Sequence, residues 1–156
     1  AMGNAWFVSN IKWVKDSHEE MDALIEFNEK TTAIADQSYK NLFGQYISSY
    51  TQGDTIFLTS YKPNELHYKA KTSKGGSAVF SEVFFPWGWN ITIDGKKAEM
   101  ARVNYVLRGL DIPAGEHEII FRFEPQSIAI TTYIAYACII VIFILLLSTA
   151  IMQIKK

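Results

Sequence analysis

The pattern of apolar and polar residues divides the chain into two parts. Between residues 54 and 123, apolar and polar residues alternate over short runs that turn residues separate, which is typical of half-buried β-strands. Between residues 127 and 154 the chain is apolar at nearly every position. The pattern therefore predicts a β-domain at residues 1–126, which we call the head, and a transmembrane helix with a short tail at residues 127–156.

Predicted strands follow one another at intervals of about ten residues, a spacing typical of sandwiches and barrels. They cover residues 6–14, 56–61, 65–71, 77–85, 89–93, 97–103, 105–110 and 117–123. Glycine and proline mark the connections: Gly75–Gly76 is expected to form a hairpin, and Pro113 and Gly115 set a later turn. Asp94–Gly95 is a strong signal for a two-residue type I′ hairpin. We expect a mainly β, antiparallel sandwich or jelly roll.

One or two short helices are predicted near the N-terminus. Ser17 and Glu20 have the spacing of a capping box, and the apolar stripe that follows predicts a helix ending near Asn28. A second helical or irregular stretch is predicted at residues 39–47.

The distribution of charge is uneven. The chain holds 15 Lys plus Arg and 16 Asp plus Glu, for a net charge of −1, yet the 28 residues from Ser127 to Ile154 contain no charged residue and no histidine. The head therefore carries a net charge of −3, without a concentrated basic surface, so we expect no nucleic-acid partner. The single cysteine, Cys138, lies in the apolar run, which excludes a disulfide or thiolate-zinc site within the head.

The apolar run is long enough to cross the hydrocarbon core of a bilayer, which is about 30 Å thick. Tyr133 and Tyr136 mark the headgroup level on the side of the head, and Lys155 and Lys156 close the other end. The lysine pair favours a cytoplasmic C-terminus, and hence an extracytoplasmic head. Two alternatives are a tail-anchored protein with a cytoplasmic head and the C-terminal end of a longer multi-pass protein. The latter would explain why no signal peptide precedes the head.

Chemical motifs are few. His18, His67 and His117 match no metal-binding spacing, and the chain contains no nucleophile elbow and no glycine-rich phosphate loop. The carboxylates fall mostly at turns and on solvent faces of strands. We therefore predict no catalytic residue, no metal and no cofactor in this chain.

Aromatic residues gather in the run from Phe84 to Trp89. Phe85 and Trp89 are expected to pack in the core of a sandwich, since aromatic rings dominate such cores. Trp87 stands between Pro86 and Gly88, so it either packs in the core or is exposed by the turn. An exposed tryptophan is a candidate stacking surface for a sugar.

The run from Phe84 to Pro125 resembles the C-terminal extracytoplasmic domain of YfhO-type bacterial membrane proteins. The resemblance is carried in order by an aromatic corner, an Asp-Gly hairpin, an Asn-x-x-x-Arg strand, a Pro-x-Gly-x-His turn and an aromatic ending before proline. These are Pro86, Gly88 and Trp89; Asp94 and Gly95; Asn104 and Arg108; Pro113, Gly115 and His117; and Phe121, Phe123 and Pro125. Trp87, inserted between the proline and the glycine, departs from the pattern.

The resemblance implies a parent protein similar to multi-pass glycosyltransferases that use polyprenyl-phosphate sugars, with an acidic catalytic residue in an early loop upstream of Ala1. This chain is then a non-catalytic, extracytoplasmic accessory domain on the bacterial inner membrane. Its implied partners are the bilayer, the other transmembrane helices of the parent and a cell-envelope glycan. The alternative is a single-pass, membrane-anchored binding module with no attached enzyme. An independent enzyme is the third reading.

The Asn-x-x-x-Arg pair also has a physical interpretation. Asn104 and Arg108 lie four residues apart on a predicted strand, so both side chains would point to one face. Arg108 would pair with a carboxylate such as Glu82 and join neighbouring strands, or it would contact a glycan or lipid phosphate. The candidate glycan contacts are thus Trp87, Trp89, Asn104 and Arg108.

Overall fold

The computed structural model describes residues 2–43 and 53–154. The chain forms two compact units, Ala1–Phe123 and Glu124–Lys156. The first unit is mainly β, with a short N-terminal helix, and the second is a long apolar helix, so the predicted fold class is confirmed.

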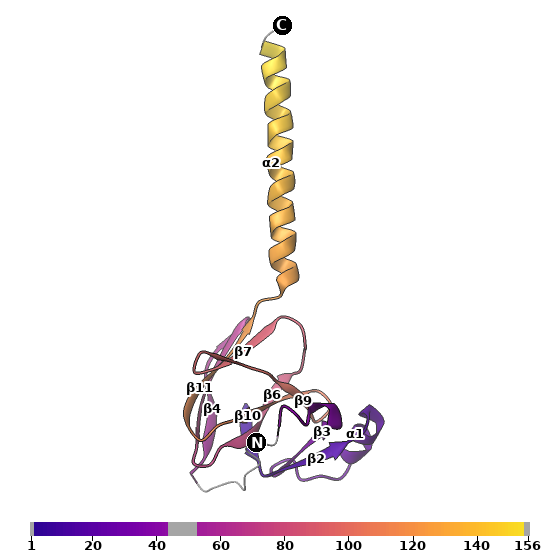
Figure 1. Ribbon diagram of the computed structural model, residues 1–156, viewed down its shortest axis with the longest axis vertical. Helices are drawn as coiled ribbons and strands as arrows, with labels where there is room; N and C mark the ends of the chain where they lie inside the picture. Colours follow the sequence, from indigo (N-terminus) through magenta and orange to yellow (C-terminus); the bar gives the residue numbers. More distant parts are fainter. Residues whose placement is uncertain (1, 44–52, 155–156) are drawn as a thin grey trace. The chain divides into compact units, whose positions relative to one another are not determined.

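Within the described residues, the head holds eleven strands in two sheets (Figure 1). Sheet A contains, in spatial order, β1 (Ala5–Val8), β6 (Gly76–Val83), β10 (Leu107–Ile112), β9 (Ala101–Val103), β3 (Thr32–Asp36) and β2 (Asn10–Val14). Sheet B contains β4 (Thr55–Lys62), β5 (Glu65–Thr72), β11 (Gly115–Phe123), β7 (Trp89–Ile93) and β8 (Lys96–Ala98). All pairs are antiparallel except β2 and β3, which run parallel.

Several predicted strands are divided in the structure. The run at residues 6–14 forms β1 and β2, and the run at residues 97–103 forms β8 in sheet B and β9 in sheet A. Strand β3 was not predicted, because it is buried along most of its length and shows no alternation of polar and apolar residues.

The connections between strands confirm one of the predicted hairpins and contradict another. Asp94 and Gly95 have φ angles of 51° and 76°, as a type I′ turn requires, and they join β7 to β8 as predicted. Gly75–Gly76 is not a hairpin, since it leads from β5 in sheet B to β6 in sheet A. Pro113 likewise lies where the chain passes from β10 in sheet A to β11 in sheet B.

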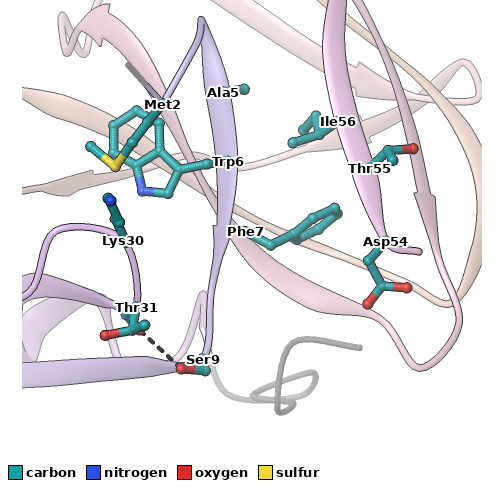
Figure 2. Close-up of a pocket in the computed structure, with 10 residues that line it drawn as sticks. All are labelled: Met2, Ala5, Trp6, Phe7, Ser9, Lys30, Thr31, Asp54, Thr55 and Ile56. Carbon is teal, nitrogen blue, oxygen red and sulfur yellow. Dashed lines mark hydrogen bonds between the residues drawn. The ribbon is translucent and has the colours of Figure 1, made fainter. Parts of the chain in front are cut away.

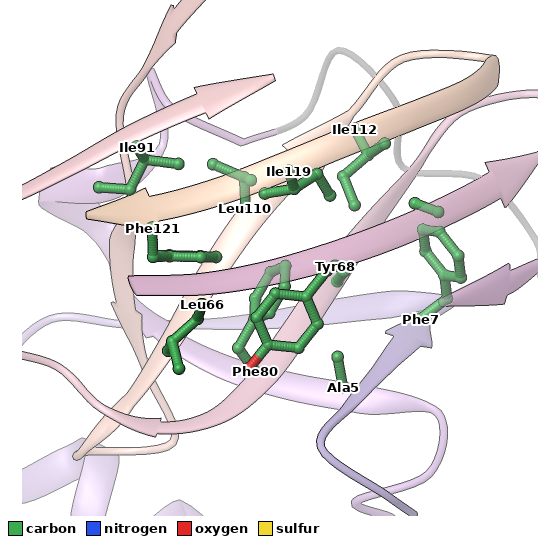
Figure 3. Packing of buried hydrophobic residues seen from close by; sticks show 12 residues of the cluster. Ala5, Phe7, Leu66, Tyr68, Phe80, Ile91, Leu110, Ile112, Ile119 and Phe121 are labelled. Atoms are coloured by element: carbon green, nitrogen blue, oxygen red, sulfur yellow. The ribbon is translucent and has the colours of Figure 1, made fainter. Parts of the chain in front are cut away.

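The main core lies between the two sheets (Figure 3). Tyr68 of β5, Phe80 of β6 and Phe121 of β11 form a triangle of edge-to-face rings, with centroids 4.9 to 5.8 Å apart. Burial raises the pKa of Tyr68 far above its ordinary value. A second cluster, which includes Val79, Val103 and Phe43, covers the other face of sheet A.

Helix α1 (Ser17–Ala23) is shorter than predicted and begins one residue earlier than the capping-box spacing indicated. Asp16 is the N-cap, and its side chain accepts hydrogen bonds from the backbone N–H groups of His18 and Glu19. The prediction that Ser17 and Glu20 form the box was wrong. The second predicted helix is only a 3-10 turn at Gln37–Tyr39, and residues 44–47 of that stretch lie outside the described part.

Helix α2 (Gln126–Ile154) is one continuous helix, drawn in orange to yellow in Figure 1. Its stretch Gln126–Gln153 is long and apolar enough to cross a membrane, and none of that stretch is buried by the protein. Tyr133 and Tyr136 are exposed on it. Lys155 and Lys156 lie outside the described residues, so their predicted role at the membrane surface stays a prediction.

Candidate functional site

The aromatic residues 84–89 form the connection that takes the chain from β6 in sheet A to β7 in sheet B. The backbone N–H of Phe84 donates to the carbonyl of Val106 (2.7 Å), and Gly88 supplies a φ of 89°. Trp87 is 71% exposed, which decides between the two alternatives for its turn position, and its ring packs edge-on against Phe85 at 5.3 Å. Pro86 beside it is exposed too. The connection therefore presents an indole ring to the surface on a short, anchored turn.

Phe85 and Trp89 differ in burial. Phe85 was expected in the core but is exposed, and its ring lies 6.5 Å from that of Phe123 at the end of β11. Trp89 is half-buried, packs against the main core and lies 5.1 Å from Phe123. We call Phe85, Trp87, Trp89 and Phe123 the aromatic corner.

Arg108 supports the corner from below. Its guanidinium lies 4.2 Å from the centroid of the Trp89 ring, its Nε donates to the carbonyl of Val83 (2.9 Å), and the residue is only 3% exposed. Burial lowers the pKa of Arg108, and the charge of Glu82 acts in the opposite direction. The predicted salt bridge to Glu82 is thus replaced by a backbone carbonyl and an aromatic face, although Arg108 does join strands β10 and β6.

Asn104 and Arg108 do not share a strand, which corrects the prediction. Asn104 lies in the connection between β9 and β10 with a φ of 48°, and Tyr105 follows with a φ of 69°. Two left-handed residues in succession break the strand period on which the prediction relied. Asn104 is buried: its backbone N–H donates to the carbonyl of Ile34, and its side-chain oxygen accepts from the N–H of Ile34, both at 2.8 Å.

A buried carboxylate fixes the same connection. Glu20 of α1 is fully buried, accepts from the N–H of Tyr105 (2.8 Å), and pairs with the guanidinium of Arg102 (2.8 Å). Sequence reasoning missed this role because Glu20 was assigned to a capping box. An acidic residue on the apolar side of a helix would have been the only local signal.

The hairpin and the Pro-x-Gly-x-His turn meet in space. His117 Nδ1 lies 2.6 Å from Asp94 Oδ2, and His117 Nε2 lies 3.2 Å from the carbonyl oxygen of Ala114. Asp94 also accepts from the backbone N–H of Glu118, and these hydrogen bonds, that of His117 above all, lower the pKa of the Asp94 carboxyl. The two ring nitrogens of His117 face Asp94 and the carbonyl of Ala114, so the ring connects the two turns.

A groove of about 460 Å³ lies elsewhere, between the edge strands β1 and β4 (Figure 2). Figure 2 shows Phe7 pointing toward Ile56 of β4, whereas Trp6 points to the opposite side of β1, near Lys30. The groove is mostly apolar. Its carboxylate, Asp54, already accepts from the backbone N–H of Ser73 (2.8 Å), so the described lining of the groove lacks the converging polar side chains that orient a ligand.

A metal centre has no support in residues 2–43 and 53–154, where no three His, Cys, Asp or Glu side chains come together in a way that could hold an ion. The aromatic corner is therefore the candidate functional site. The family described as bacterial membrane protein YfhO matches residues 30–151, most of the chain. The chain belongs to this family.

Membership of the YfhO family, with the exposed apolar helix α2, makes the chain a membrane protein associated with the lipid bilayer. The match includes the aromatic corner, both turns joined by His117, and most of α2. Neither a curated protein nor a solved structure matches the chain in the same kind of comparison.

The structure brings together some of the residues that carried the YfhO resemblance and separates others. Trp87 and Trp89 share the corner with Arg108 beneath them, and Asp94 meets His117 at the hairpin. Asn104 instead lies in the connection between β9 and β10. Phe123 was noted only as part of the strand ending, and its contact with Trp89 is the feature that links the corner to the end of the head.

Proposed function

We propose that the head is a non-catalytic, extracytoplasmic accessory domain of a YfhO-type membrane glycosyltransferase, which helps to transfer a lipid-linked sugar to a cell-envelope glycan. Residues 1–126 are this domain, and residues 127–156 are a transmembrane helix with a cytoplasmic tail. The parent protein supplies the catalytic residue and the remaining transmembrane helices.

The observation that carries the proposal is the exposed ring of Trp87 in a protein of the YfhO family. A sugar ring presents a flat face of C–H groups that stacks on an indole, and Trp87 is held for this by Phe85 on one side and the Pro-Gly turn on the other. Trp89 and Arg108 act below the surface by fixing the corner, and Asn104 acts through the connection that leads to Arg108.

Glycan binding is tested with Trp87→Ala and the control Tyr61→Ala, which removes an exposed ring of β4 in sheet B. The full chain in nanodiscs is applied to purified bacterial cell-envelope glycans, and binding is measured by biolayer interferometry. We expect Trp87→Ala to lose binding and Tyr61→Ala to keep it. Equal binding by both variants, with unchanged circular dichroism, would remove the proposed contact.

Orientation is tested with a cysteine at an exposed position of the head. Ile25→Cys in a Cys138→Ala background places the only thiol of the chain outside α2, because Cys138 is the only native cysteine. A membrane-impermeant maleimide should label it in intact cells after the outer layers are opened. Labelling only after the inner membrane is permeabilised would place the head in the cytoplasm.

The connection to a transferase is tested at the gene. An in-frame coding sequence for about a dozen hydrophobic spans immediately upstream is expected for a multi-pass parent. A stop codon and a ribosome-binding site directly before Met2 would favour the alternative, a single-pass binding module with no attached enzyme.

A further inference from the structure

One end of the head exposes a group of apolar side chains that do not belong to the core. Val83 is 67% exposed, and Phe85, Trp87 and Val106 are exposed beside it. The four residues lie near one another along the backbone, because Phe84, between Val83 and Phe85, is hydrogen-bonded to Val106, and the ring of Phe85 packs on that of Trp87. We call Val83, Phe85, Trp87 and Val106 the apolar end.

The apolar end is tied by the covalent chain to the start of the membrane helix. Phe85 contacts Phe123, which is the last residue of β11, and Gln126 is the first residue of α2. Only Glu124 and Pro125 separate Phe123 from Gln126. Three peptide steps span at most about 10 Å, so Phe123 stays within that distance of the first residue of α2.

The outer face of sheet B has the opposite character. It carries a network of ion pairs, in which Glu65 accepts hydrogen bonds from His67 and from Arg122 (2.8 Å each) and Lys71 pairs with Glu116. His67 also lies 3.5 Å from Glu118. Such a face is suited to water, whereas a cluster of exposed Trp, Phe and Val side chains is not.

We propose that the apolar end is a bilayer-docking surface. Val83, Phe85 and Val106 contact the boundary between headgroups and acyl chains, and the amphipathic indole of Trp87 lies at the headgroup level, where tryptophan is enriched in membrane proteins. The proposal rests on α2 spanning the membrane and not on glycan binding. If both hold, Trp87 meets a lipid-linked sugar at the depth where its sugar headgroup lies.

Spin-label accessibility tests the docking directly. Single cysteines are placed at Val83 and Val106 in the Cys138→Ala chain, with Ile25→Cys and Phe57→Cys as controls at exposed positions outside the apolar end. The labelled chains are reconstituted in phosphatidylcholine nanodiscs, and electron paramagnetic resonance measures collisions with oxygen and with a water-soluble nickel chelate. Oxygen concentrates in the bilayer and the chelate is excluded from it.

We expect the oxygen-to-nickel accessibility ratio to be several-fold higher at Val83 and Val106 than at either control. Equal ratios at all four positions would place the apolar end in water and overturn the proposal. Low accessibility to both reagents at Val83 and Val106 alone would mean that protein, and not lipid, covers the surface, which also overturns it.

A second readout uses tryptophan emission. Brominated phosphatidylcholine should quench part of the emission of the chain, and Trp87→Phe should remove most of the quenchable part, whereas Trp6→Phe should leave it. Quenching that is unchanged in Trp87→Phe contradicts docking even if the spin-label variants fold poorly. Neither measurement involves a glycan, so docking and the proposed function can fail separately.

Discussion

The buried carboxylate of Glu20 offers the sharpest test of how the head is held together. Its two oxygens accept from the guanidinium of Arg102 and from the backbone N–H of Tyr105, each at 2.8 Å. The connection that they fix contains the left-handed pair Asn104 and Tyr105, which costs backbone energy in residues other than glycine. Glu20→Ala removes the contact that holds this conformation from the side of α1.

The expected loss follows from the burial of the pair. Removing one partner of a buried ion pair costs about 3–5 kcal/mol, because the other partner is left without compensation. The side chain of Arg102 is 26% exposed, so water restores part of its solvation and the lower limit applies. We expect Glu20→Ala to lower the free energy of unfolding by about 3 kcal/mol.

The control is the neighbouring Glu19→Ala. Glu19 is exposed and accepts from the backbone N–H of Lys15, so its loss should cost about 0.5–1 kcal/mol. A double-mutant cycle of Glu20→Ala with Arg102→Ala should give a coupling energy of about 1–3 kcal/mol for residues in direct contact.

Urea unfolding of the full chain in detergent micelles measures these differences. The four tryptophans, Trp6, Trp13, Trp87 and Trp89, all precede α2, so their fluorescence reports on the head alone. If Glu20→Ala and Glu19→Ala unfold at the same urea concentration, the buried pair does not stabilise the head and the reasoning above is refuted.

Three further variants test other contacts by the same unfolding assay. A hydrogen bond from His67 helps to lower the pKa of Glu65 from 4.5 to about 2, so the contribution of Glu65 to stability is present above pH 4.5 and lost as the pH falls toward about 2. Glu65→Gln should therefore be less stable than the unmodified chain at neutral pH and lose less stability on acidification; an identical acid slope would contradict the assignment. Gly95→Ala should lower the free energy of unfolding by about 1 kcal/mol, because φ is 76° at this position. A Cβ would contact nothing within 4 Å, so the cost comes from the backbone conformation alone; no change would show that the hairpin tolerates another turn type. Gly109→Ala should cost about 1–3 kcal/mol, because its Cβ would lie 2.6 Å from the ring of Phe43; a neutral effect would mean that the ring moves freely.

Local chemistry explains what the sequence could predict. Asp94–Gly95 carries its turn type in two residues, and the alternation along β5 and β11 follows from one face being buried. An apolar run without charges leaves few alternatives to a long exposed helix such as α2. These features need no knowledge of what lies across the fold.

The misassigned features depend on distant partners. Gly75–Gly76 has the composition of a hairpin, but composition does not say whether the next strand pairs with the previous one or enters the other sheet. Glu20 has the spacing of a capping residue, yet it meets Arg102 across 82 positions. Asn104 does not lie on a strand. Its side chain accepts from the backbone N–H of Ile34 in β3, a strand that the periodicity of the sequence does not reveal.

The candidate site could be predicted only in part, because it too depends on distant partners. The exposure of Trp87 follows from its neighbours Pro86 and Gly88, which are adjacent in sequence. The support of Trp89 by Arg108 requires β10 and β7 to meet across the sandwich, and the natural expectation for a buried arginine was a carboxylate. A guanidinium stacks on a ring and donates to a carbonyl without a counter-ion in contact, so the charge pattern alone was misleading.

In the proposed docking, the short connection before α2 and the apolar end act together. An isolated patch of four apolar side chains on a head with a net charge of −3 would bind a bilayer weakly, since it has neither a large area nor a basic surface. A covalent tether of two residues converts this binding into an intramolecular step at high effective concentration, so weak contacts suffice to orient the head. With a long flexible linker the effective concentration would be lower. The same four apolar side chains would then stay exposed to water, which favours aggregation. The lack of a stalk is therefore the physical condition under which such a small surface can fix the head on the membrane.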